Sequence, residues 1–293
     1  MSSNILEELK VKVFKSGDPS YLYIGLNTLI FLLAALINVP VFLSGNGGLE
    51  YESFIREYFG FPAAIASSPQ FLYTLITYQF FHEGFFHLLF NMLWLYWMGR
   101  IFLDFLKPRQ FHFVYLTGGI TGAIFFAAAF YVFPVFKSVS GASIIGSSAA
   151  VMAIVTATAT LVPNYTIRLF LFGEVKLKYL ALAYILLDII GTSSANAGGS
   201  FSHIGGAVLG FSYTKMLQNG SDWSSLFKKK PKLRVVKNDK QNWKNESKSS
   251  ESIKSDNYVD QREIDAILDK ISKTGYDKLS KAEKETLFKA SKH

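Results

Sequence analysis

The segment 81–91, FHEGFFHLLFN, contains two histidines and an asparagine whose spacing could support chemistry. A zinc-protease helix of the H-E-x-x-H type places its histidines four residues apart, so that both face one metal ion. His82 and His87 are five residues apart, which separates them by about 140° on a helix that turns about 100° per residue. His87 and Asn91 are four residues apart and share one face. The spacing disfavours a zinc protease and singles out His87 with Asn91.

Six apolar segments could hold these residues in a membrane. Half of the 293 residues are hydrophobic, 16% are aromatic, and the mean hydropathy of +0.23 is high for a soluble protein of this size. A membrane-spanning helix needs about 20 mainly apolar residues. Glu7 and Glu8 precede the first segment, so we expect a retained anchor and no cleaved signal peptide. The predicted fold is all-α, a polytopic bundle of six transmembrane helices at 21–43, 85–104, 111–134, 144–162, 178–195 and 200–217.

The basic residues between these segments predict their orientation. Lysine and arginine near the ends of spans favour the cytoplasmic side. The outer connections hold only Arg56 and Lys137. We therefore expect a multi-pass protein with both termini in the cytoplasm, in a bacterial inner membrane, with an organellar membrane as the alternative. The inner connections and the N-terminal segment hold Lys10, Lys12, Lys15, Arg100, Lys107, Arg109, Arg168, Lys176 and Lys178.

This orientation brings four polar residues to a similar depth. The even-numbered spans run from outside to inside, and His87, Asn91, Ser148 and His203 each lie in the first turns of one of them. A serine, two histidines and an amide are the parts for acyl transfer: a nucleophile, a general base and donors for an oxyanion. Asp188 could be imagined as a third member that orients a histidine, but we expect an interfacial aspartate near the outer end of its span.

Small residues at every fourth position predict that the fourth and sixth spans touch. Such stripes let the backbones of membrane helices approach closely, although they are also common in ordinary membrane packing. Contact between these two helices would let His203 reach Ser148. The stripes are Ala149, Ala153 and Ala157 in one span and Ser202, Gly206, Gly210 and Thr214 in the other.

Three motifs in this order resemble the rhomboid family of intramembrane serine proteases. HEGFFHLLFN is similar to the family's H-x-x-x-x-H-x-x-x-N, and GSSA at 146–149 is similar to its G-x-S-G/A nucleophile motif. SHIGGAVLG at 202–210 is similar to the family's A-H-x-x-G-x-x-x-G around the base. The resemblance covers roughly residues 20–217 and suggests the bacterial six-span type with a C-terminal cytoplasmic extension.

The resemblance implies an intramembrane serine endopeptidase that cleaves transmembrane or juxtamembrane segments of other membrane proteins. In that case Ser148 attacks the peptide carbonyl and His203 removes its proton, as a dyad without an orienting carboxylate. The backbone N–H of Ser148 and the side chains of His87 and Asn91 would stabilise the oxyanion. No cofactor or metal is implied. The alternative is an inactive rhomboid-like pseudoprotease that binds membrane clients.

Other residues near these motifs leave choices open. The tripeptide Gly-Ala-Ser ending at Ser143 imitates the nucleophile motif, but Ala149 follows Ser148, and we expect Ser143 at the surface. Met152 stands where some family members have a tyrosine that packs on the base. His82 is expected to support the loop or the oxyanion donors, whereas we expect His112 and His293 to be incidental.

The chain beyond these spans has a different composition. We predict a cytoplasmic N-terminal segment at 1–20, the six-span domain at 21–218, a basic flexible tether at 219–257 and a small cytoplasmic helical hairpin at 258–293. Attraction to anionic lipid explains the basic tether more simply than nucleic-acid binding. The hairpin is predicted from Ile264, Ile267, Leu268 and Ile271 at helical spacing, Gly275 after the helix end, and a capping box of Ser280 with Glu283. Its partner is not indicated.

Overall fold

The computed structural model describes residues 4–65, 69–137, 139, 141–169, 173–192, 197–227 and 261–290. The chain divides into two compact units, Met1–Lys230 and Pro231–His293. His293 and most of the predicted tether lie outside the described residues. The first unit carries every predicted site residue, so its helices are described first.

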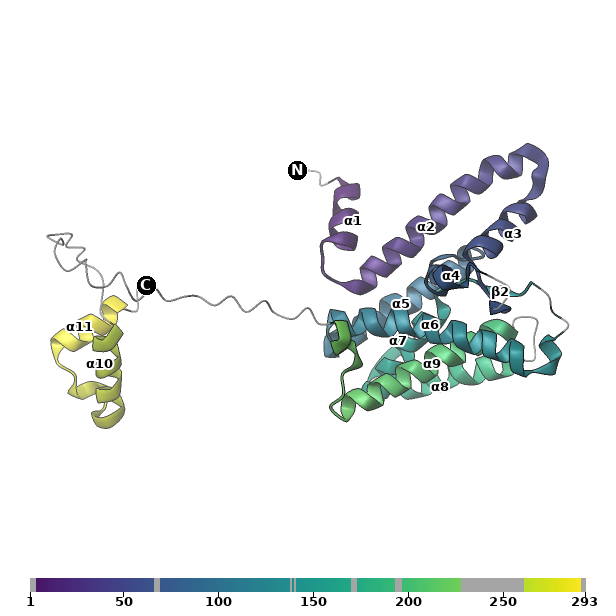
Figure 1. The fold of residues 1–293 in the computed structure, drawn as a ribbon. Coiled ribbons are helices and arrows are strands. Elements are labelled where there is room, and N and C mark those ends of the chain that lie inside the picture. The colour runs from purple at the N-terminus through teal and green to yellow at the C-terminus, as the bar shows by residue number, and fades with distance from the viewer. Residues whose placement is uncertain are drawn as a thin grey trace, which may run out of the picture. The chain divides into compact units, whose positions relative to one another are not determined.

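The first unit is a helical bundle with a protruding helical hairpin (Figure 1). Its predicted spans correspond to α2, α5, α6, α7, α8 and α9, and α2 with α3 extends away from the bundle in Figure 1. The described part of the segment 44–83 includes α3, α4 and the short turn η3. The helices are α1 (Ile5–Phe14), α2 (Pro19–Val41), α3 (Gly47–Phe59), α4 (Phe71–Thr77), α5 (Phe85–Phe105), α6 (Pro108–Val132), α7 (Ser148–Leu161), α8 (Leu177–Gly191) and α9 (Ala197–Gln218), with the shorter turns η1 (Phe42–Asn46), η3 (Tyr78–Phe80), η4 (Pro134–Phe136) and η5 (Trp223–Phe227).

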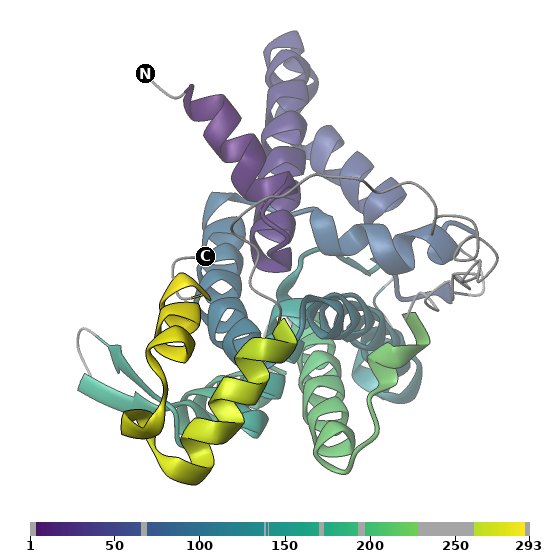
Figure 2. The same ribbon diagram turned by 90° about the vertical axis from the view of Figure 1, so that its left-hand side faces the viewer.

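Two short antiparallel strand pairs correct the all-α prediction. β1 (Phe61–Pro62) pairs with β2 (Ser143–Ile144) and ties the segment after α3 to the loop before α7. β3 (Thr166–Leu169) pairs with β4 (Gly173–Lys176), and this hairpin projects from the bundle in Figure 2. This hairpin lies in the predicted connection between the fourth and fifth spans, where the alternation of Thr166, Ile167, Arg168 and Leu169 suits a strand.

Two described helices are long and apolar enough to cross a membrane by themselves, over Pro19–Gly45 and Pro108–Val132. Helix α7 is apolar but has 14 residues, and α8 has 15, fewer than the about 20 that a complete span needs. The membrane character is therefore supported by these two helices, while the count of six spans stays a prediction.

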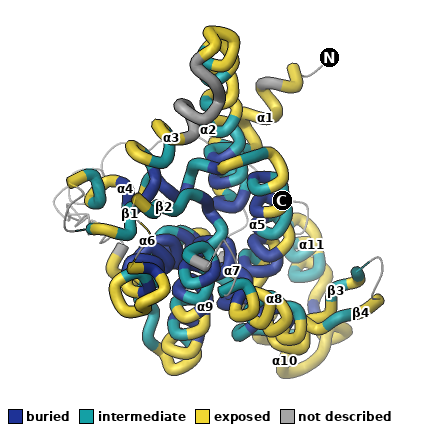
Figure 3. Tube along the Cα trace, turned by 90° about the vertical axis from the view of Figure 1, so that its right-hand side faces the viewer, coloured by how far each residue is buried: buried dark blue, intermediate teal, exposed yellow. Residues whose placement is uncertain are grey.

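Helix α2 shows how the outside of the first unit differs from its core. Leu32, Leu33, Leu36 and Ile37 are all more than half exposed, and Figure 3 shows exposed stretches along α2. A continuous apolar surface of this kind is rare on a protein that faces only water. It is suited to contact with lipid.

Helix α7 lies at the centre of the bundle. Eleven of its 14 residues are buried, and α5, α6 and α9 pack around it. The stretch around α6 and α7 is the largest buried region in Figure 3. A helix that is hydrophobic all round can be stable only when other elements cover all of its faces. The position of α7 follows from its sequence.

The predicted contact between small residues of α7 and α9 is confirmed. A Cβ atom added to Gly206 would lie 2.1 Å from the carbonyl oxygen of Ala149, and one added to Gly210 would lie 2.2 Å from that of Ala153. One turn further on, the Thr214 hydroxyl donates a hydrogen bond of 3.2 Å to the carbonyl of Ala157. These two glycines allow a backbone approach that a side chain would prevent.

The second unit contains the helices α10 (Gln261–Thr274) and α11 (Lys281–Ala290), with the turn η6 (Tyr276–Lys278) between them. Gly275 has a φ of 85° and donates its N–H to the carbonyl of Ile271, which ends α10. Ser280 and Glu283 form the predicted capping box, with N–H donors to each other's side chains at 2.7 and 3.3 Å. Ile267 and Leu279 are the buried hydrophobic residues within the described part of this unit.

Candidate functional site

The loop before α7 presents Ser148 as the first residue of the helix. Gly146 has a φ of 129°, which favours glycine, and its N–H donates a hydrogen bond of 2.9 Å to the carbonyl of Tyr78. Ser147 is completely buried, and its hydroxyl lies 3.1 Å from Nε2 of His82. This contact agrees with the predicted role of His82 in supporting the loop. These bonds fix the backbone on which Ser148 sits.

Ser148 and His203 meet near the N-terminal ends of α7 and α9. The Oγ atom of Ser148 lies 2.7 Å from Nε2 of His203. This is a normal hydrogen-bond distance for a hydroxyl donating to a neutral imidazole. The arrangement places a general base within reach of the serine proton. The close backbone approach at Gly206 brings the two helices near enough for this contact.

Asp188 also contacts His203, whereas we expected an interfacial aspartate and a dyad without an orienting carboxylate. Its Oδ1 atom lies 2.7 Å from Nδ1 of His203. Asp188 is 8% exposed, and its Oδ2 atom is buried without a hydrogen-bond partner in the described part of the chain. The order of the two helices was a signal in the sequence, because Asp188 lies near the C-terminal end of α8 and His203 near the N-terminal end of α9.

His87 and Asn91 line the same cleft as Ser148 and His203. A Cβ atom added to Gly146 would lie 2.9 Å from Nε2 of His87 and 3.7 Å from Oγ of Ser148. The His87 ring therefore packs against the loop that carries Ser148. The side-chain amide of Asn91 donates a hydrogen bond of 2.8 Å to the carbonyl of His87. An amide has two N–H donors, so one remains for another acceptor.

The cleft above these residues has a volume of about 760 Å³. This volume lies within the range of about 300–1,000 Å³ that is usual for ligand sites. Its walls combine the polar residues above with large apolar side chains from α5 and α8, among them Phe90, Trp94 and Leu187. A cleft of this kind can accept an extended peptide with apolar side chains.

The two histidines of the H-E-G-F-F-H segment are closer than their helical spacing predicts. Their ring centroids are 5.1 Å apart and the rings are nearly perpendicular. The reason is that α5 begins at Phe85, after Gly84, so His82 does not lie on the helix for which the angle was calculated. In the stretches that the structure describes, no group of three or more metal-binding side chains comes together.

Met152 and Tyr184 bear on how the base is held. Met152 is buried. Tyr184 of α8 meets the ring of His203 at an angle of 64°, with the ring centroids 6.3 Å apart. A tyrosine thus contacts the histidine from a different helix than the family comparison predicts. His112, expected to be incidental, has its Nδ1 atom 3.1 Å from the hydroxyl of Tyr23.

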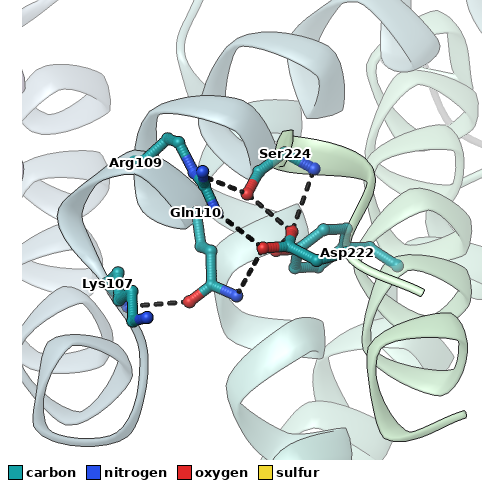
Figure 4. Close-up of polar contacts among 6 residues, drawn as sticks. Lys107, Arg109, Gln110, Asp222 and Ser224 are labelled. Atoms are coloured by element: carbon teal, nitrogen blue, oxygen red, sulfur yellow. Dashed lines mark hydrogen bonds and ion pairs between the residues drawn. The ribbon is translucent and has the colours of Figure 1, made fainter. Parts of the chain in front are cut away.

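The far end of α9 is held by a polar cluster that the sequence did not predict (Figure 4). Arg109 at the start of α6 bonds Asp222 at 2.7 Å and Ser224 at 3.2 Å. Tyr213 donates to the other carboxylate oxygen at 3.1 Å. Burial alone would raise the pKa of Asp222, but hydrogen bonds from Ser224 and Tyr213 and the charge of Arg109 lower this pKa below its usual value. We call these four residues the Asp222 cluster.

Comparison with known proteins agrees with the motifs. Residues 69–219, just over half of the chain, match the model of the Rhomboid domain. Residues 252–293 match a family of unknown function, DUF6576. This matched stretch contains α10 and α11. No curated protein matches the chain.

Proposed function

Because the chain belongs to the rhomboid family of intramembrane serine proteases, we propose that it is an active serine endopeptidase. It cleaves transmembrane or juxtamembrane segments of other membrane proteins. The observation that carries this proposal is the 2.7 Å contact between Ser148 Oγ and His203 Nε2 in an open cleft. A family member that had lost its activity would have no need of this pairing.

The reaction proceeds in two steps. The Oγ atom of Ser148 attacks the peptide carbonyl carbon while Nε2 of His203 takes the hydroxyl proton. His203 then returns this proton to the nitrogen of the leaving amine, and an acyl-enzyme remains. In the second step His203 takes a proton from water, the hydroxide attacks the acyl carbon, and the proton returns to Ser148 as the new carboxyl end leaves.

N–H donors at the N-terminal end of α7 stabilise the oxyanion of each tetrahedral intermediate. The N–H groups in the first turn of a helix have no partner within the helix, and Ser148 occupies this position in α7. His87 and the remaining N–H of Asn91 add side-chain donors from α5. Donors that are already aimed at the developing charge need little rearrangement in a site of low dielectric constant.

The membrane determines which substrates can react. A transmembrane helix hides its carbonyls in internal hydrogen bonds, so it must unwind locally before Ser148 can attack. Helix-breaking and small residues near the cut favour this unwinding. With six spans and both termini in the cytoplasm, the site opens toward the outer face, which in our proposal is that of a bacterial inner membrane.

The test is cleavage of reporters in liposomes that contain the purified protein. Each reporter is a single-span protein with glycine, proline or small residues near the outer end of its span. Ser148→Ala should lower the cleavage rate by about 10⁴-fold or more, since loss of a serine nucleophile costs up to about 10⁶-fold. The matched control is Ser143→Ala, which removes the hydroxyl of the other candidate serine and should leave the rate unchanged.

Two results would contradict the proposal. Equal cleavage by the wild-type protein and Ser148→Ala would show that another group performs the reaction. A folded wild-type protein that binds the reporters and cleaves none of them would support the pseudoprotease alternative.

A further inference from the structure

We propose that Asp188 is a positioning residue that completes a Ser148, His203 and Asp188 triad, an inference that rests on the proposed protease function. Asp188 touches neither substrate nor the reacting atoms. It acts through Nδ1 of His203, on the side of the ring opposite to Ser148.

The contacts of His203 define a continuous line of hydrogen bonds. Its Nε2 atom lies 2.7 Å from Ser148 Oγ and its Nδ1 atom lies 2.7 Å from Asp188 Oδ1. The His203 and Asp188 side chains are only 15% and 10% exposed. Both bonds are therefore shielded from bulk water, which strengthens them and fixes the ring between two partners.

The position of Asp188 is unfavourable for a carboxylate that has no special role. It lies in the last turn of α8, which ends at Gly191, where the helix dipole disfavours negative charge. It is also buried in a helix that we assign to the membrane, where a carboxylate is costly unless it is paired. The bond to His203 supplies the pairing that this position requires.

The substitution at Met152 supports the same conclusion. The family resemblance places a tyrosine at this position in some members, packed on the base. In this chain Met152 is apolar and buried, so it cannot hydrogen-bond the imidazole as a hydroxyl could. Asp188 and the edge contact of Tyr184 hold His203 from α8 instead.

The chemical consequence is a defined tautomer. The carboxylate of Asp188 accepts a hydrogen bond from Nδ1–H of His203, so the lone pair of Nε2 faces the hydroxyl of Ser148. When Nε2 takes the serine proton, the ring becomes a cation beside the carboxylate, and no proton moves to Asp188. The titratable groups that face His203 are Asp188 and Tyr184 from α8 and His87 from α5.

The experiment measures the reaction of the full-length protein with a fluorophosphonate, as a maximal rate and an apparent affinity. Asp188→Asn has nearly the same shape and keeps an oxygen for Nδ1, but it removes the charge. The maximal rate should fall by about 10²–10⁴-fold, as for loss of the carboxylate in other triads, while the affinity for the reagent stays the same. Asp188→Ala should lose at least as much.

A pH profile separates positioning from a purely structural role. In Asp188→Asn the acid limb of the rate profile should move to lower pH, because the protonated imidazole loses the negative charge that stabilises it. The matched control is Asp104→Asn, which removes an exposed carboxylate from the end of α5 and should change neither the rate nor the profile. Thermal unfolding of each variant establishes that it is folded.

The possible failures are distinguishable. If the wild-type protein does not react at all, the proposed function fails. If the wild-type protein reacts and folded Asp188→Asn reacts at the same rate with an unchanged pH profile, only the role of Asp188 is overturned. A fall in rate that is matched by a fall in the unfolding temperature, without a shift of the acid limb, would also overturn it.

Discussion

Helices α7 and α10 have the same length, 14 residues each, and are stabilised in different ways. Helix α7 has no charged residue, is buried over most of its length and contacts α9 through backbone and small side chains. Helix α10 buries Ile267 and exposes most of its other described side chains, and its links are ion pairs such as Lys270 with Glu283. The contrast teaches that substitutions should be severe near α7 and mild near α10.

The difference also separates the two kinds of functional argument. Around α7 every polar group is costly, so the positions of Ser148, His203 and Asp188 need a reason beyond solubility. Around α10 charged residues are the usual composition of a solvated surface. Chemical roles can therefore be argued from single residues in the first unit, whereas the charged residues of the second unit indicate only how its two helices are held together.

The largest effect is expected where a side chain would separate α7 from α9. Gly206→Ala adds a Cβ atom 2.1 Å from the carbonyl oxygen of Ala149. Overpacking of a close contact costs about 1–3 kcal/mol or more, and we expect the upper end because the obstacle is backbone. Unfolding in a detergent titration measures the loss, and the reaction with fluorophosphonate should fall with it.

Gly84→Ala is the matched control for this substitution. A Cβ atom added to Gly84 has nothing within 4 Å, and its φ of −164° suits any residue. Its effect on unfolding should stay within about 0.5 kcal/mol, as is usual away from packed sites. Equal destabilisation by the two alanines would contradict the close approach of α7 and α9.

An intermediate effect is expected at the Asp222 cluster, which is polar like α10 but partly buried. Asp222→Asn removes the charge that Arg109 and Tyr213 contact. Charge-assisted hydrogen bonds contribute about 1.5–3 kcal/mol, and partial exposure reduces the expected loss to about 1–2 kcal/mol. The same unfolding titration measures it, with Asp104→Asn as the exposed control.

The pH dependence of the Asp222 cluster follows from the lowered pKa of Asp222. A carboxylate whose pKa is lower in the folded state stabilises that state above its ordinary pKa, and this stabilisation is lost as the pH falls through the lowered value. Acidification should therefore destabilise the wild-type protein more than Asp222→Asn. An identical pH dependence of the two proteins would count against this role.

The smallest effect is expected in the second unit. The hydrogen bonds from Lys270 and from Ser280 lower the pKa of Glu283 to about 2. Glu283→Gln should increase hydrogen exchange in both α10 and α11, because this residue joins the two helices. In the wild-type protein this protection is complete above the ordinary pKa of a glutamate and is lost as the pH falls toward 2.

Glu285→Gln is the matched control for Glu283→Gln. It removes one negative charge from α11 but leaves the bond between the two helices intact, so it separates the effect of that bond from the effect of charge alone. Glu285 pairs with Lys289 within α11 at 3.0 Å, and such pairs add little to stability. Exchange in α10 should be unchanged in this variant. If the two glutamine variants exchange alike, the bond between the helices has no stabilising role.

The sequence could predict that four site residues lie together, because depth in a membrane can be estimated for every span. These residues are Ser148, His203, His87 and Asn91. Helical spacing orders residues along each span, alternating charge gives the direction of the span, and the two together give depth. Small residues at every fourth position then identify the helices that touch. None of these steps needs a contact between distant residues to be known in advance.

Asp188 and the Asp222 cluster could not be predicted in the same way. Depth does not say how a helix is rotated about its axis, so Asp188 could have faced lipid headgroups as well as His203. The bond between Arg109 and Asp222 joins residues 113 positions apart, which no local pattern specifies. The helical angle between His82 and His87 was misjudged because α5 begins at Phe85, and the start of a helix is set by local capping and packing.

The most direct test of the central claim is to locate the fluorophosphonate adduct in the full-length protein by mass spectrometry of its peptides. The claim is that His203 activates Ser148 where α7 meets α9. We expect one adduct, on Ser148, that is absent from His203→Ala although this variant remains folded. An adduct on any other serine, or undiminished labelling of Ser148 without His203, would contradict the account.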